Sequence, residues 1–120
     1  MAMLQKVHLL DAPFSMGSKL VGSKYFPDMI RDHGLEDILA KHVPHVSSIG
    51  RGIAGHAGNY DNVGQYCEAL HDAIIANPEA LKDFLLILGG DHSLSIGTIN
   101  AIDKIQRGNT GVLWVDAHAD

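Results

Sequence analysis

The 120-residue chain contains a single cysteine, and this shortage excludes a class of protein. Cys67 cannot form a disulfide within the chain, so we expect a reducing, cytoplasmic setting rather than a disulfide-stabilised secreted domain. The N-terminal stretch MAMLQKVHLL also lacks the long apolar core and the cleavage site of a signal peptide. Cys67 lies on the apolar stripe of a predicted helix, which favours a core position over a nucleophile.

The sequence also lacks an excess of basic residues and any long apolar run. Nine Lys and Arg stand against 14 Asp and Glu, giving a net charge of −5 at pH 7. Binding nucleic acid requires a basic surface that neutralises phosphates, so we expect no nucleic-acid partner. No segment approaches the roughly 18 uninterrupted apolar residues of a membrane span, so we expect no membrane partner. The remaining composition, 46% hydrophobic and 19% charged, is typical of one globular domain.

Apolar segments alternate with helical patterns along the chain. Strands are predicted at 5–13, 45–53, 84–88 and 112–115, and helices at 27–34, 35–42, 62–76 and 93–105, with a glycine-rich loop at 52–61. Strand, helix and strand in that order form a parallel βαβ unit with a right-handed crossover. The sequence therefore predicts an α/β fold, a three-layer α/β/α arrangement around a mainly parallel sheet.

Several side chains are expected in the core. The continuous apolar run Phe84 to Leu88 predicts a strand covered on both faces, and Trp114 lies in a second strand expected to be buried. The helix at 93–105 should turn most of its aliphatic residues inward: Leu94, Ile96, Ile99, Ile102 and Ile105.

Polar residues follow two of the predicted strands. GGDHS (89–93) follows the run at 84–88, and VDAHAD (115–120) ends the strand at 112–115. Reactive groups of a parallel sheet gather beyond the carboxyl ends of its strands. If the extended path continues past Val115, alternate residues share one face of the chain, and His92 lies at the matching end of the other strand. The residues expected on that face are Asp116, His118 and Asp120.

Carboxylates and imidazoles gathered in one place repel or become protonated unless a positive charge joins them. Nitrogen and oxygen donors without a thiolate favour Mn²⁺, Zn²⁺ or Fe²⁺, and the predominance of carboxylate oxygen favours Mn²⁺. A carboxylate can bridge two ions, and such pairs activate water. Asp91 and His92 taken alone fit a simpler interpretation, a turn in which Asp91 or Ser93 caps the next helix.

The two motifs together resemble a known family. GGDHS followed by DAHAD resembles the first two metal motifs of the ureohydrolases, the arginases and agmatinases, and DAPFSMG and GVLWVDAHAD are more similar to arginase. The resemblance implies the N-terminal half of the arginase-type fold. Residues 1–120 would then be a partial ureohydrolase domain that lacks its C-terminal half.

The resemblance also implies roles for individual residues. His92 and Asp120 would bind one Mn²⁺, His118 would bind a second Mn²⁺, and Asp116 would bridge both ions, whereas Asp91 would complete the motif without binding metal. No catalytic residue beyond the metal ligands is implied within the chain. The implied reaction is hydrolysis of arginine to ornithine and urea by a metal-bridging hydroxide.

The family's third metal motif, S-x-D-x-D, is absent, so we expect the 120 residues alone to be inactive. The implied partners are a small guanidino substrate, with arginine favoured, and copies of the same chain in a trimer or hexamer of the complete enzyme. Three alternatives stay open: an agmatinase or other guanidino-acid ureohydrolase, a non-catalytic fragment of such an enzyme, and a related deacetylase with a D-x-H motif. GGDHS argues against the deacetylase.

Overall fold

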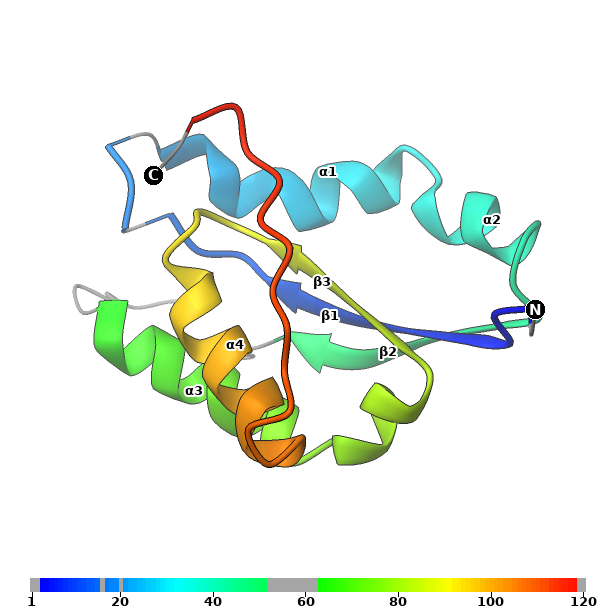
Figure 1. Cartoon of the computed structure of the whole chain (residues 1–120). Coiled ribbons are helices and arrows are strands. Elements are labelled where there is room, and N and C mark those ends of the chain that lie inside the picture. The colour runs from blue at the N-terminus through cyan, green and yellow to red at the C-terminus, as the bar shows by residue number, and fades with distance from the viewer. Residues whose placement is uncertain (1–2, 16, 20, 52–62, 119–120) are drawn as a thin grey trace.

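A parallel sheet of three strands forms the centre of the computed structural model, which describes residues 3–15, 17–19, 21–51 and 63–118. The strands are β1 (Lys6–Ala12), β2 (His45–Arg51) and β3 (Phe84–Gly89), and β1 lies between the other two (Figure 1). Both neighbours pair with β1 in the parallel direction. The predicted glycine-rich loop at 52–61 lies outside the described residues.

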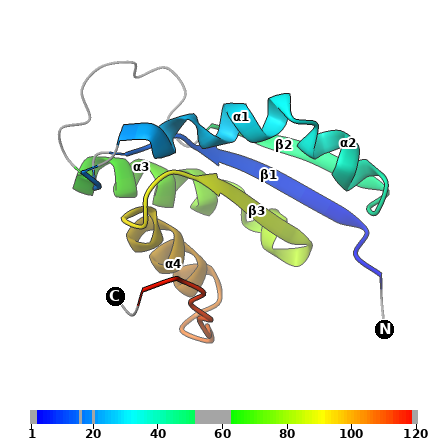
Figure 2. The ribbon, with the colours of Figure 1, turned by 90° about the horizontal axis from the view of Figure 1, so that it is seen from above.

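Helices cover both faces of this sheet. They are the 3-10 helix η1 (Val21–Tyr25), α1 (Phe26–Asp32), α2 (Leu35–Ala40), α3 (Val63–Ile75), the 3-10 helix η2 (Pro78–Lys82) and α4 (Leu94–Ile105). α1 and α2 lie over one face, and α3 and α4 lie over the other (Figure 2). The predicted three-layer α/β/α fold is therefore confirmed. None of the helices in the described part of the chain has the length and apolar character needed to cross a bilayer.

The central strand β1 supplies apolar side chains to two cores because its residues alternate between faces. Val7 and Leu9 pack with Val43, on the side of α2. Leu10 belongs to a second cluster that includes Tyr66 of α3. Burial on both faces explains why apolar residues occur on both faces of this strand, next to the buried polar residues His8 and Asp11.

α3 and α4 approach each other closely at Gly97. A methyl group added to Gly97 would lie 2.3 Å from the carbonyl oxygen of Cys67. Cys67 is buried, which confirms its predicted core position, and its Sγ donates a hydrogen bond to the carbonyl of Ser93 at 3.1 Å. Because backbone occupies the space beside Gly97, no rotamer change can make room for a side chain.

The substitution Gly97→Ala should therefore destabilise the fold by about 1–3 kcal/mol, since the two helices must separate to admit one methyl group. The free energy of unfolding in urea, measured without added metal, checks this expectation. Gly111→Ala is the matched control, because an added methyl group there would meet nothing within 4 Å. Equal stability of the two variants would contradict the close helix contact.

The prediction of a buried strand at 112–115 is wrong. Residues 112–115 form no strand, and Figure 1 shows this red segment returning from α4 as irregular chain. Leu113 is 90% exposed, Val115 is 88% exposed, and Trp114, predicted in the core, is 47% exposed. Within the described part of the chain the segment pairs with no strand, so no sheet neighbour covers its side chains.

For the same reason β3 is less buried than its apolar sequence predicts. It pairs with β1 on one side and with no described strand on the other, so Phe84 is 49% exposed. Ile96 of α4, predicted to face inward, is 56% exposed. Gly97 and Ala101 occupy the buried face of α4 instead, because small residues allow the close approach of α3.

Candidate metal centre

The chain leaves β3 through a tight turn that begins at Gly90. A side chain at Gly90 is excluded, since its Cβ would lie 2.5 Å from the carbonyl oxygen of Phe14 and 2.8 Å from that of Ala12. The backbone N–H of Asp91 donates to the same Phe14 carbonyl at 3.0 Å. Glycine is required here because only a residue without a side chain permits this close backbone approach.

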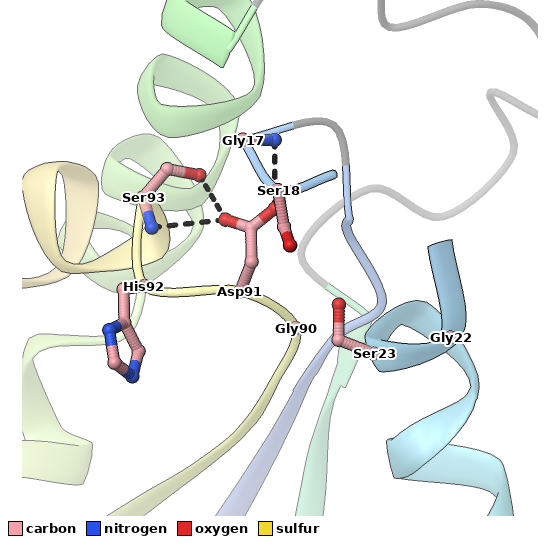
Figure 3. A pocket seen from close by; sticks show the side chains of 8 residues that line it. All are labelled: Gly17, Ser18, Gly22, Ser23, Gly90, Asp91, His92 and Ser93. Carbon is pink, nitrogen blue, oxygen red and sulfur yellow. Dashed lines mark hydrogen bonds between the residues drawn. The ribbon is translucent and has the colours of Figure 1, made fainter. Parts of the chain in front are cut away.

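Asp91 fixes this turn to the loop that follows β1. Its Oδ2 accepts a hydrogen bond from the backbone N–H of Gly17 at 2.8 Å, and its Oδ1 accepts hydrogen bonds from the N–H of Ser93, at 3.0 Å, and from the Ser93 hydroxyl (Figure 3). These contacts give Asp91 a structural role at the start of α4. They position the adjacent His92 beside a pocket of about 560 Å³ whose lining includes Ser18 and Ser23.

Asp116 lies between two of the imidazoles that the sequence singled out. Its Oδ2 lies 3.2 Å from Nδ1 of His92, and its Oδ1 lies 3.4 Å from Nδ1 of His118. The Asp116 side chain is 6% exposed, whereas those of His92 and His118 are 63% and 81% exposed. The structure thus brings together three of the four predicted ligands. The fourth, Asp120, lies outside the described residues.

The surroundings of Asp116 favour its ionised form. The pKa of Asp116 is lowered, first by the hydrogen bond from the backbone N–H of His118 and then by the indole N–H of Trp114 and the nearby His92, while desolvation acts in the opposite direction. Hydrogen bonds donated to a carboxylate stabilise its charge. Asp116 is therefore present as an anion near neutral pH, the form that binds a cation.

An Asx turn, rather than strand alternation, places His118. Oδ1 of Asp116 accepts a hydrogen bond from the backbone N–H of His118 at 2.8 Å, and the chain bends at residues 117–118. The expectation that the extended path continues past Val115 is therefore wrong for this stretch. The hydrogen bond from the His118 N–H to the Asp116 side chain bends the backbone away from an extended path, and the His118 imidazole therefore lies beside the Asp116 carboxylate.

The donors present fit a divalent cation. The donor types, imidazole nitrogen and carboxylate oxygen, are those that bind divalent transition-metal ions. The two imidazoles lie beside different oxygens of the Asp116 carboxylate, at the separations of direct ion pairs. Among the described residues no group of three or more His, Cys, Asp or Glu side chains is arranged to hold an ion. The described part of the chain therefore brings the proposed ligands together only in pairs, His92 with Asp116 and Asp116 with His118.

Sequence reasoning missed a charged cluster at the carboxyl end of β1. Asp11 is 5% exposed and accepts hydrogen bonds from Arg31 of α1, at 2.8 Å from Nη2 and 3.1 Å from Nε. The hydrogen bond with Asp11 raises the pKa of Arg31 above its ordinary value. Arg31 also pairs with Glu36, and Arg51 of β2 lies 3.6 Å from Asp11. The sequence signal was a lone aspartate inside an apolar strand.

Comparison with known proteins gives consistent matches. Residues 5–120 match the model of the arginase family. An arginase of Staphylococcus aureus (strain MSSA476) is 32% identical over 133 residues, an alignment that covers 100% of this chain and 43% of the relative. Arginase-1 of Bos taurus is 32% identical over 127 residues, covering 97% of this chain and 38% of the relative.

Solved structures give the same result. The crystal structure of an Entamoeba histolytica arginase in complex with L-ornithine matches with a TM-score of 0.77 and 25% identity, covering 98% of this chain and 42% of that one. A Bacillus cereus arginase matches with a TM-score of 0.64 and 26% identity, covering 83% and 35%. The chain therefore spans about two-fifths of the length of the relatives it matches.

Proposed function

This chain belongs to the arginase family, and from that premise we propose that it contributes to the manganese-dependent hydrolysis of arginine to ornithine and urea. The observation that carries the proposal is Asp116, whose two carboxylate oxygens each lie beside a different imidazole. The names of the relatives favour arginine as the substrate, and the Entamoeba relative binds L-ornithine.

We assign ligand roles to four residues. His92 and Asp120 would hold one Mn²⁺, His118 would hold the other, and Asp116 would bridge the two. Two such ions supply a strong nucleophile from water near neutral pH, which the resonance-stabilised guanidinium group requires. The donor set supports this assignment, because it contains imidazole and carboxylate without thiolate.

The surroundings of the proposed ligands support their roles. Hydrogen bonds from neighbouring groups lower the pKa of Asp116 and keep it ionised. Asp91 holds the turn that carries His92, through Gly17 and Ser93. The pocket of about 560 Å³ beside His92 has the size of a small-molecule site, and we propose that it adjoins the position of the guanidino substrate.

The remaining parts of the proposal concern the assembly and its setting. We propose that residues 1–120 form part of a ureohydrolase domain, which is supported by the two-fifths share of the relatives that they match. We further propose a homo-oligomer, a trimer or hexamer, in the cytoplasm. The buried, unpaired thiol of Cys67 is compatible with a reducing compartment.

A substrate comparison tests the proposed activity. With Mn²⁺ present, the full-length protein should release urea from arginine in preference to agmatine or guanidinobutyrate, because the relatives that this chain matches are named arginases. Colorimetric urea determination measures the three rates. Urea release from agmatine alone would overturn the assignment of arginine and favour an agmatinase.

The same assay on residues 1–120 alone distinguishes an active unit from a non-catalytic one. We expect no urea from the isolated chain, since its four candidate ligands cannot fill two coordination spheres. Two tightly held Mn²⁺ ions together with turnover by the isolated chain would contradict this expectation.

A further inference from the structure

We infer that Trp114 is a positioning residue for the candidate metal centre, holding Asp116 and His92 in place, an inference that rests on the proposed function. Trp114 contacts both residues. Its indole Nε1–H donates a hydrogen bond to Oδ2 of Asp116 at 3.3 Å, and its ring packs edge-on against the imidazole of His92, with centroids 5.4 Å apart and planes at 80°.

The hydrogen bond from Trp114 completes the support of the Asp116 carboxylate. Oδ1 accepts from the backbone N–H of His118, and Oδ2 accepts from the indole of Trp114. A carboxylate oxygen has two lone pairs, so accepting one hydrogen bond does not by itself prevent it from binding a cation. An indole N–H only donates and does not titrate near neutral pH, so it orients the carboxylate without competing for the ion.

The ring contact acts on the second ligand. The His92 side chain is 63% exposed, and its Nδ1 already lies 3.2 Å from Asp116, so the ring of Trp114 adds a second restraint on the imidazole. The edge-to-face geometry with Trp114 is a favoured arrangement of aromatic rings and limits rotation of the imidazole. Trp114 therefore contacts two proposed ligands from different parts of the chain, His92 in the turn after β3 and Asp116 in the segment 112–118.

Trp114, which the sequence placed in a buried strand, lies at the surface beside these polar residues and is 47% exposed. It also lines an apolar groove of about 360 Å³ with Ile87 and Leu94, so it joins the apolar core of the sheet to the polar cluster.

Metal affinity in two variants tests the inference. Trp114→Phe keeps a ring beside His92 and removes the N–H, so the full-length protein should bind Mn²⁺ about 10-fold more weakly, as when partners that orient metal ligands are lost. Leu113→Ala, at a neighbouring side chain that is 90% exposed, is the control and should bind as the wild type does. The electron paramagnetic resonance signal of free Mn²⁺ measures each affinity, and the unfolding midpoint of each metal-free variant reports its folding.

The outcomes separate this inference from the proposed function. If the wild type binds no Mn²⁺, the metal centre is wrong and the role of Trp114 is wrong with it. If the wild type binds Mn²⁺ and both variants bind equally well, only the role of Trp114 is overturned. If Trp114→Phe fails to fold, Trp114→Leu, which removes both the N–H and the ring, is measured in the same way, and wild-type Mn²⁺ affinity in that variant overturns the inference.

Discussion

Replacing Asp116 by asparagine should lower the rate of urea release from arginine by at least about 100-fold and reduce the number of bound Mn²⁺ ions. Loss of a residue that merely orients a ligand costs about 10–100-fold, and the shared ligand of two ions should cost at least as much. Asparagine retains an oxygen that can accept the His118 N–H, so the Asx turn and the fold should persist. Urea determination and metal analysis on the full-length protein measure both effects.

Asp72→Asn provides the matched control for this experiment. Asp72 is an aspartate of α3 that pairs with His71 and has a side chain 72% exposed, outside the candidate centre. The same chemical change there should leave both turnover and metal content at the wild-type level. Full turnover with two bound ions in Asp116→Asn would contradict the bridging role of Asp116.

Replacing Asp11 by asparagine should destabilise the protein by about 3 kcal/mol. The Asp11 carboxyl is buried and receives hydrogen bonds from Nε and Nη2 of Arg31, so the change leaves a charged guanidinium beside a neutral amide. Removing one partner of a buried pair costs about 3–5 kcal/mol, and the lower end applies because the Arg31 side chain is 19% exposed. The free energy of unfolding in urea near neutral pH, without added metal, measures the loss.

The control uses the other carboxylate of the same arginine. Glu36 pairs with Arg31 as well, but its side chain is 57% exposed. Ion pairs that water reaches contribute about 0–1 kcal/mol, so Glu36→Gln should change stability by no more than that. If Glu36→Gln and Asp11→Asn destabilise equally, burial is not what makes the Asp11 pair strong.

Most secondary structure could be predicted because each element carries its own local signal. α3 shows apolar residues at helical spacing, and Tyr66, Cys67, Leu70 and Ile74 are buried as that spacing requires. Pro27 lies in the first turn of α1, and Gly34 follows the helix with φ of +86°, a conformation that glycine adopts without strain. The parallel direction of the sheet follows instead from the order of strands and helices along the chain.

The sequence proposed which residues form the candidate site but did not predict the geometry of the three that the structure describes. His92, Asp116 and His118 stand out because each belongs to a polar group that directly follows an apolar segment, and the two groups together form a family's motifs. The route by which they meet depends on contacts between segments distant in sequence, such as His92 with Asp116. Spacing alone predicted an extended face, whereas the side chain of Asp116 bends the backbone at His118.

Residue types and their periods thus predicted the α/β class, and the two motifs carried the resemblance to the family to which the comparisons assign the chain. Only the tertiary structure decided that Asp91 supports a turn, that Asp11 pairs with Arg31, and that Trp114 lies beside candidate ligands instead of in the core. The physical reason is that periodicity reports which residues prefer burial or a given backbone. The hydrogen-bond and ion-pair partners of polar side chains depend on how segments distant in sequence pack together, and local sequence patterns do not specify that packing.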